Sequence, residues 1–325
     1  MPELRAYDSP AAAGVFCVEK GCELCPRRCG AARQAPGSYG FCASPGELRI
    51  ARAAAHFGEE PCVSGTRGSG AVFFTGCNLR CRFCQNHRIA RGEGGFPVST
   101  EGFRAILYRL EDQGVHNINL VTGSHYSRRI AEALAGMRLS IPVVWNSSAY
   151  ESVPQLKELE GLVQIYLPDL KYADAALAGA LSAAPDYPSV ALAAIREMHR
   201  QTGPAVTGPD GLLQKGVLLR HLILPGYVEN TLRVLDTVED ELPHREMLFS
   251  LLAQYTPVQA LVQDGTLDAF PSLQRTLTPE EYRRVLDYLD FSSIEEGYVQ
   301  ELGAAGEDAI PAFDGTGVIP VTPRP

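Results

Sequence analysis

The sequence predicts an α/β protein that folds as a partial (β/α)6 barrel, TIM-like but open, with a small cysteine-rich module at its amino-terminal end. Short apolar runs alternate with amphipathic segments of helical period from residue 70 onward, and all nine cysteines lie in the first 84 residues. Strands joined by helical crossovers form a parallel sheet. A closed barrel of eight units usually needs about 250 residues, so the six units found here indicate an open barrel.

Each expected strand is a short apolar run, and the runs are 71–75, 117–122, 141–145, 162–167, 216–224 and 246–254. Between them, Phe103, Ile106, Leu107 and Leu110 fall on one face of a helix that Ser99 can cap. Residues 230–242 form a further helix. Thr278, Pro279 and Glu281 make a capping-box start with proline at the first helical position, opening a helix that runs to about Leu289.

This pattern divides the chain into three predicted parts. Residues 1–65 form the cysteine-rich, metal-binding module, and residues 66–295 form the barrel. Residues 296–325, rich in glycine, proline and acidic residues, form an extended tail.

Composition excludes several classes of partner. The chain has 325 residues, 45% of them hydrophobic, which is enough to bury a large core. A net charge of -9 leaves no basic field to attract nucleic acid or anionic lipid. No apolar run is long enough to span a bilayer, and the first residues lack the pattern of an export signal. We therefore expect a cytoplasmic protein without nucleic-acid or membrane partners.

The stretch TGCNLRCRFCQN places Cys77, Cys81 and Cys84 on the loop that leaves the first predicted barrel strand. Parallel β/α folds carry their chemistry on such loops. Thiolates favour zinc or iron-sulfur clusters, and structural zinc normally has four protein ligands. Only His87 is a local candidate for a fourth ligand. Three thiolates on a four-iron cluster would instead leave one iron open to another ligand.

A second set of cysteines precedes the barrel. Cys22, Cys25, Cys29 and Cys42 are spaced by two, three and twelve residues and make a closed set of four soft ligands. Such a set suits tetrahedral zinc or a fully liganded auxiliary iron-sulfur cluster, and the sequence leaves both open.

The three-cysteine loop, with aromatic Phe83 before its last cysteine, resembles that of the radical S-adenosylmethionine (SAM) enzymes. The resemblance extends to EEPCVSGTRGSGAVFFTGCNLRCRFCQN, VVWNSSAYE, IYLPDLKYAD and LLRHLILPG, and more weakly to FDGTGV; these runs are similar to those of pyruvate formate-lyase activating enzyme-like radical SAM proteins. It implies a [4Fe-4S] cluster on Cys77, Cys81 and Cys84, and SAM bound to the open iron.

The activity that the resemblance implies is reductive cleavage of SAM to a 5'-deoxyadenosyl radical, which abstracts hydrogen from a substrate. That substrate is either a glycyl-radical enzyme, as a protein partner, or a small molecule. The electron donor is a one-electron protein such as flavodoxin or ferredoxin. No side chain is expected to be catalytic in its own right, because the cofactor carries the difficult chemistry.

The same resemblance implies which residues contact the cofactor. Phe83 would meet the adenine ring, and the others lie just past the cluster or at the carboxyl ends of strands. The implied contacts are Phe83, Asn86, Thr122, Gly123, Ser124, Asn146, Ser147, Asp169, Lys171 and Arg220. A simpler interpretation of Asp169 and Lys171 is a surface ion pair, worth under about 1 kcal/mol.

A competing hypothesis is a non-catalytic zinc-binding or redox-sensing protein whose cysteines only hold the scaffold together. That protein would need a fourth ligand near Cys84 and no cofactor-sized set of polar residues at the strand ends.

Overall fold

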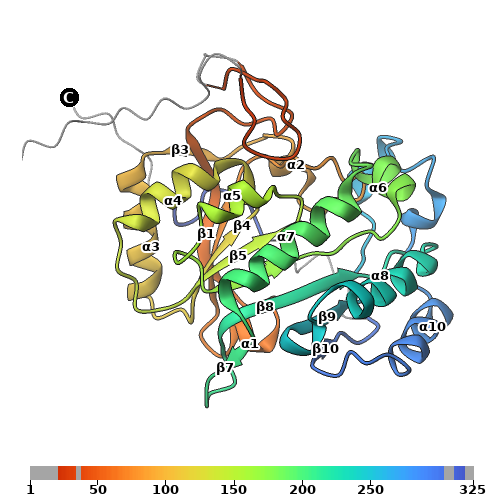
Figure 1. The fold of residues 1–325 in the computed structure, drawn as a ribbon. Helices are drawn as coiled ribbons and strands as arrows, with labels where there is room; N and C mark the ends of the chain where they lie inside the picture. Colours follow the sequence, from red (N-terminus) through yellow and green to blue (C-terminus); the bar gives the residue numbers. More distant parts are fainter. Residues whose placement is uncertain (1–20, 34–37, 304–310, 319–325) are drawn as a thin grey trace, which may run out of the picture.

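The computed structural model describes residues 21–33, 38–303 and 311–318 (Figure 1). In this part of the chain, nine strands form a sheet in the order β10-β9-β8-β6-β5-β4-β2-β1-β3, and β7 pairs beside β8. The strands are β1 (Leu48–His56), β2 (Ser69–Phe74), β3 (Phe96–Val98), β4 (Ile118–Val121), β5 (Val143–Ser147), β6 (Ile165–Pro168), β7 (Val206–Thr207), β8 (Leu213–Leu222), β9 (Leu248–Leu252) and β10 (Gly297–Val299).

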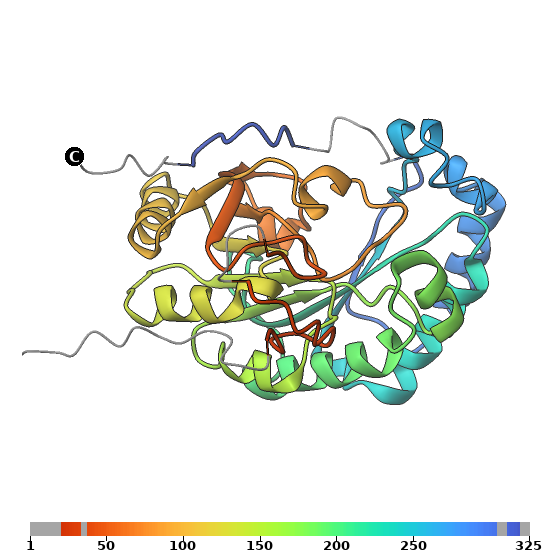
Figure 2. The ribbon, with the colours of Figure 1, turned by 90° about the horizontal axis from the view of Figure 1, so that it is seen from above.

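Helices cover the outer face of this sheet (Figures 1 and 2). The helices are α1 (Pro61–Ser64), α2 (His87–Ala90), α3 (Thr100–Asp112), α4 (Ser127–Ala135), α5 (Val153–Lys157), α6 (Ala175–Ser182), α7 (Tyr187–Thr202), α8 (Val228–Glu241), α9 (Gln259–Gln263) and α10 (Pro279–Leu289), with short 3-10 turns at Ser124–Tyr126, His244–Glu246 and Pro271–Gln274.

The predicted partial (β/α)6 barrel is confirmed. Strands β2, β4, β5, β6, β8 and β9 pair in parallel, and β10 continues the parallel sheet beyond β9. At the other end, β1 and β3 are antiparallel. The ends of this strand order, β3 and β10, do not pair with each other, so the barrel stays open.

Strand β1 has no counterpart in the sequence analysis, which places no strand before residue 70. It runs antiparallel to β2, from Ile50 opposite Phe74 to His56 opposite Ser69. Its alanines give only a weak alternating pattern, and its pairing partner holds it in the sheet. The module boundary at residue 65 stays a prediction. The described residues that carry the amino-terminal cysteines lie over the carboxyl ends of the strands (Figure 2).

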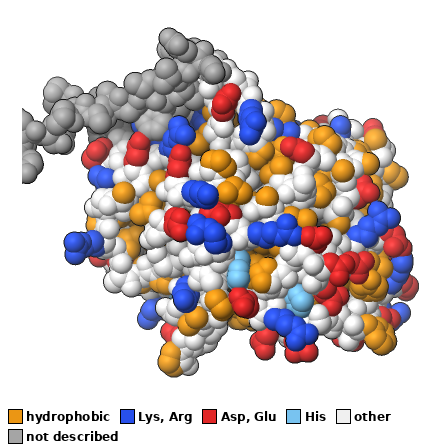
Figure 3. Space-filling view, in the orientation of Figure 1, with side chains coloured by type: hydrophobic (Ala, Val, Ile, Leu, Met, Phe, Trp, Pro, Cys, Tyr) orange, Lys and Arg blue, Asp and Glu red, His pale blue; other side chains and the backbone are white. Residues whose placement is uncertain are grey.

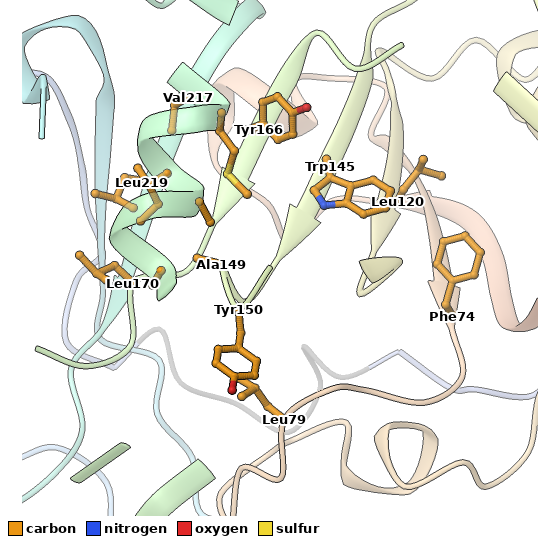
Figure 4. Close-up of a cluster of buried hydrophobic side chains, with 14 of the residues drawn as sticks. Phe74, Leu79, Leu120, Trp145, Ala149, Tyr150, Tyr166, Leu170, Val217 and Leu219 are labelled. Carbon is orange, nitrogen blue, oxygen red and sulfur yellow. The ribbon is translucent and has the colours of Figure 1, made fainter. Parts of the chain in front are cut away.

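Two layers of apolar side chains hold the barrel together. Between sheet and helices, Trp145, Tyr166 and Phe74 are buried with other large side chains (Figure 4). Inside the barrel, Cys62 and Val63 of α1 join a cluster with strand residues such as Val144, Ile165 and Leu218. Each fully buried side chain of this size stabilises the fold by about 1.5–3 kcal/mol. In Figure 1, α1 lies at the end of the barrel opposite the amino-terminal segment.

The predicted helix starts are confirmed. The Ser99 side chain accepts from the backbone N–H of Gly102 at the start of α3. Thr278 and Glu281 form the full capping box of α10.

The predicted tail, residues 296–325, is described over 296–303, where β10 joins the sheet, and over 311–318. The second of these segments is docked on the barrel. The N–H of Gly315 donates to the Ala51 carbonyl, and the N–H of Ala53 donates to the Thr316 carbonyl, each at 2.9 Å. The ring of Phe313 meets that of Phe73 edge to face at 5.3 Å. The segment therefore runs beside β1 (Figure 2).

On the face drawn in Figure 3, acidic and basic side chains are interspersed, without a broad patch of one sign. Within the described residues, no helix combines the length and the apolar character that crossing a bilayer requires.

Candidate cluster and cofactor site

The loop after β2 brings the three predicted cluster cysteines together. Cys77, Cys81 and Cys84 line one cavity of about 290 Å³. Burial, with a smaller contribution from the neighbouring Cys81 thiol, raises the pKa of Cys77 and of Cys84 to about 12. Left alone, these thiols would be protonated, whereas metal coordination deprotonates a thiol outright. The donor set thus fits a metal cluster, with three soft sulfurs facing one space.

Donors and cations surround these sulfurs. The N–H of Leu79 lies 3.4 Å from Cys77 Sγ, and Ser182 Oγ lies 3.0 Å from Cys81 Sγ. Lys171 is close enough to lower the pKa of both Cys77 and Cys84. Hydrogen bonds to sulfur and nearby positive charge both stabilise a reduced, more negative cluster.

The loop is held in place from two sides. Gly76 has φ +96°, and a Cβ added there would come within 1.8 Å of Ser44 Oγ. Only glycine therefore lets the loop pass beneath the amino-terminal segment. On the other side, the backbone N–H groups of Arg80 and Arg82 donate to the carbonyls of Ser182 and Leu181, at the end of α6.

Four of the residues predicted to contact the cofactor lie in a single network at the strand ends. Arg220 on β8 donates to Asp169 Oδ1 at 2.9 Å and to Asn146 Oδ1 at 2.7 Å. Lys171 Nζ lies 2.7 Å from Asp169 Oδ2. Burial alone would raise the pKa of Asp169, but the charges of Arg220 and Lys171 outweigh it and lower that pKa. This is a partly buried network and not the exposed ion pair of the simpler interpretation.

Two members of the network were missed by the sequence analysis. Glu59 accepts from Arg220 Nη1 at 2.8 Å and from Asn119 Nδ2 at 2.9 Å. Asn146 Nδ2 also donates to Glu59, at 3.2 Å. Glu59 precedes α1 at the far end of the barrel, and no local pattern marks such a residue as part of the strand-end network.

Ser124 and Ser147 have a different arrangement. Both hydroxyls lie 2.7 Å from the carboxylate of Glu151, which also accepts from Trp145 Nε1 at 2.7 Å. Burial raises the pKa of Glu151, and these three donors oppose that effect. Both serine side chains are therefore engaged inside the protein, next to the strand ends.

The turn after β4 carries the two other residues predicted at that strand. Thr122 has φ +60°, which is strained for a β-branched residue and is a feature that clusters at functional sites. Its N–H donates to the Asn146 carbonyl at 2.8 Å. The next residue, Gly123, packs so closely that an added Cβ would lie 2.8 Å from Ile130 Cδ1. The turn is thus rigid and tied to β5.

The last two predicted contacts lie beyond the cluster loop. The Phe83 ring packs against Tyr255, with ring centroids 6.2 Å apart. Asn86 is the N-cap residue of α2, and its buried Oδ1 has no hydrogen-bond partner among the described residues. It lines a second cavity of about 360 Å³ together with Phe313 of the tail and Thr256 of the loop after β9.

The amino-terminal set of cysteines lies against this site. Cys22, Cys25 and Cys42 are buried, and Cys29 is exposed. The Cys77 N–H donates to the Cys42 carbonyl at 3.2 Å, which joins the two cysteine loops directly. Among the described residues, no three His, Cys, Asp or Glu side chains are grouped so as to hold a single metal ion.

Comparison with known proteins identifies the family of this chain. The family model described as the radical SAM superfamily matches residues 71–233, which is half of the chain. An uncharacterized protein of Methanocaldococcus jannaschii is 27% identical over 280 residues, covering 83% of this chain and 74% of that protein.

Solved structures are similar at low identity. SuiB of Streptococcus suis bound to S-adenosylmethionine matches with 13% identity and a TM-score of 0.44, over 72% of this chain and 46% of SuiB. A mutant of spore photoproduct lyase matches with 12% identity and a TM-score of 0.46, over 70% of this chain and 74% of the lyase. The chain thus spans less than half of SuiB. On the match of the family model, this protein belongs to the radical SAM superfamily.

Proposed function

We propose that Cys77, Cys81 and Cys84 hold a [4Fe-4S] cluster, that the polar strand ends hold SAM beside it, and that the enzyme abstracts hydrogen from a substrate. When bound, the reduced cluster and SAM supply a 5'-deoxyadenosyl radical, which takes a hydrogen atom from the substrate. The observation that carries the proposal is that three thiols share one cavity beside the Lys171–Asp169–Arg220 network. Membership of the superfamily implies both cofactors.

The residues of the network differ in the hydrogen-bond donors that remain available for a ligand. Arg220 uses Nε, Nη1 and Nη2 on Asp169, Glu59 and Asn146. It therefore acts as a positioning residue that fixes these acceptors. Lys171 meets Asp169 through one of its three protons and keeps the others for a ligand. We assign to Lys171 the contact with the carboxylate of SAM.

Backbone groups complete the binding surface in this proposal. The chain lacks the Gly-Gly-Glu triplet common in the wider superfamily, since its second barrel strand ends in VTGSHY. Thr122, held with φ +60°, and Gly123 present a rigid turn whose carbonyls can accept from the ammonium of SAM. The Phe83 ring and the unpaired Asn86 Oδ1 would serve the adenosine part.

We infer the class of substrate from the family resemblance and from the lining of one cavity. We propose that the substrate enters the 360 Å³ cavity between the residues after Cys84, the loop after β9 and Phe313. Its lining includes the amide side chains of Gln85 and Gln259, which can pair with peptide groups. A backbone segment of a glycyl-radical enzyme is therefore our first candidate substrate, ahead of a small molecule.

The test is anaerobic reconstitution followed by iron counting and measurement of 5'-deoxyadenosine released from SAM under a one-electron reductant. The wild type should cleave SAM, and Cys81→Ala should lose both the cluster signal of this site and the cleavage. Cys62→Ala, a matched change at a buried cysteine on α1, should retain both. Intact SAM with a fully loaded wild-type site would overturn the proposal.

The substrate class needs its own assay. Anaerobic incubation with a glycyl-radical enzyme, SAM and the same one-electron reductant should produce a protein-based radical detectable by electron paramagnetic resonance. Release of 5'-deoxyadenosine without any such signal would leave hydrogen abstraction standing and exclude the protein tested.

A further inference from the structure

We propose that Cys22, Cys25, Cys29 and Cys42 bind a second iron-sulfur cluster, in contact with the loop of the first, and that buried Arg33 provides its counter-charge. The proposal goes beyond the radical SAM activity, which needs only the three cysteines of the barrel loop.

The four thiols share one neighbourhood. The thiols of Cys42, Cys22 and Cys29 all lie close enough to Cys25 to act on its thiol electrostatically. A Cβ added at Gly40 would come 3.0 Å from Cys29 Sγ and 3.6 Å from Cys42 Sγ, so these two sulfurs flank the same backbone position. The fold therefore brings together Cys29 and Cys42, which twelve residues separate in the sequence.

The loop around the first three cysteines is built to turn sulfurs inward. The Gly30 N–H donates to the Cys22 carbonyl at 3.0 Å, and the Cys22 N–H donates to the Ala31 carbonyl at 3.1 Å. Gly21 has φ +78°, and a Cβ there would lie 2.0 Å from the Gly30 carbonyl oxygen. The close pairing of these two backbone stretches therefore requires glycine.

The environment of buried Arg33 supports negatively charged thiolates at this site. Arg33 is only 8% exposed, and its guanidinium donates to the backbone carbonyls of Ser44, Pro45 and His125. No carboxylate of the described residues forms an ion pair with it; the salt bridges in that part of the chain involve other residues.

The charge nearest to Arg33 comes from cysteine. The thiols of Cys42 and Cys22 lie close enough to the Arg33 guanidinium to act on its charge. A buried guanidinium facing neutral thiols would be an uncompensated charge, which proteins avoid. Metal-bound thiolates at Cys22 and Cys42 supply the missing negative charge.

The geometry favours a cluster over zinc. One zinc ion needs its four sulfurs about 2.3 Å from a single point, whereas a four-iron cluster distributes its thiolates over separate irons. Among residues 21–33, 38–303 and 311–318, no three potential ligands are arranged around one ion. The same holds for Cys77, Cys81 and Cys84, for which we propose a four-iron cluster.

Direct contacts join the two sites. Besides the bond between the Cys77 N–H and the Cys42 carbonyl, Arg80 donates to the Phe41 carbonyl, and Arg27 Nε donates to the Asn78 carbonyl at 2.8 Å. The Arg27 guanidinium also lies over the Phe41 ring, 4.0 Å from its centroid. The second cluster would thus lie directly over the loop of the first.

Metal analysis of anaerobically purified protein tests the proposal. We expect about eight iron and eight sulfide per chain, with zinc well below one equivalent. A variant with Cys77, Cys81 and Cys84 all changed to alanine should keep about four irons, and one with the four amino-terminal cysteines changed to serine should keep the other four. Four irons with one zinc in the wild type, or no iron left in the alanine variant, would overturn it.

Two further measurements do not depend on correct folding of these cysteine variants. In wild-type protein, Mössbauer spectra should show SAM perturbing iron of only one of the two clusters, because a fully liganded cluster has no open iron. Arg33→Met should lose at least half of the second cluster, whereas Arg33→Lys should retain most of it. Equal iron in both Arg33 variants would exclude the counter-charge role. The iron count does not depend on SAM cleavage, so it can fail or succeed apart from the proposed function.

Discussion

Arg220 Nη1 donates to Glu59 Oε2 at 2.8 Å, linking residues 161 positions apart in the chain. The same guanidinium holds Asp169, so one cation compensates two largely buried carboxylates. Arg220→Met would leave both without it, and we expect a loss of about 3–5 kcal/mol in the free energy of unfolding. Urea denaturation measures it.

The control for that change is Arg220→Lys. It keeps the charge but not the forked geometry, so its loss should be smaller, about 1–3 kcal/mol. If Arg220→Met stayed within about 1 kcal/mol of wild type, the network would not be a stabilising element.

Lys171 carries the proposed contact with the carboxylate of SAM. Lys171→Met should weaken SAM binding by at least about tenfold, which corresponds to about 1.4 kcal/mol, because a charge-assisted hydrogen bond is lost. Calorimetry on the reconstituted protein gives the dissociation constant. Lys157→Met, at an exposed lysine on α5, is the matched control and should bind SAM as wild type does. Equal affinities in both variants would remove Lys171 from the site.

Glu151 is a buried carboxyl group whose partners are two hydroxyls and an indole N–H. Because burial raises its pKa above the ordinary 4.5, the folded state favours the neutral form more than the unfolded state does. Its contribution to stability is therefore present below pH 4.5 and declines as the pH rises through the raised value. Glu151→Gln is neutral at every pH and should be at least as stable as wild type at pH 7.

Denaturation curves across pH test this sign. The stability difference between Glu151→Gln and wild type should grow with rising pH. A variant less stable by more than about 2 kcal/mol at neutral pH would mean that the charged carboxylate is preferred.

Glu281 titrates in the opposite direction. Hydrogen bonds from Arg275, with help from the N–H groups of Thr278 and Gly226, lower its pKa to about 2. Its stabilisation is therefore present above pH 4.5 and is lost as the pH falls towards 2. Glu281→Ala should cost about 1–2 kcal/mol at pH 7, and the cost should shrink at acid pH. The thermal unfolding of Glu281→Ala is compared with that of Glu280→Ala, a change at an exposed neighbour that should alter the stability little.

Docking of the tail on β1 depends on Gly317. A Cβ at this residue would lie 1.8 Å from the Ala53 carbonyl oxygen, so Gly317→Ala should detach residues 311–318 and expose them to protease. Gly303→Ala is the control, because Gly303 also has positive φ but an added Cβ would meet nothing within 4 Å. Limited proteolysis followed by mass spectrometry locates the cuts. Equal resistance of the two variants would show that the tail tolerates the change.

Local signals in the sequence determined the main architecture. Apolar runs and helical periodicity predicted the six parallel strands, and the capping box of Thr278 and Glu281 predicted the start of α10. The cysteine spacing predicted a metal-binding loop, and the three thiols of that loop share one cavity in the structure. These features depend on residues close together in the chain, so pattern alone reveals them.

The tertiary structure decided what depends on distant partners. Asn146, Asp169, Lys171 and Arg220 were predicted to meet at the strand ends, but Glu59 joins them only because α1 turns back into the barrel. Strand β1 forms because β2 is beside it, and the tail docks because β1 offers free carbonyls and N–H groups. Hydrogen bonds and charge compensation in a barrel act between residues tens to hundreds of positions apart, and a single sequence carries no local pattern for such pairs.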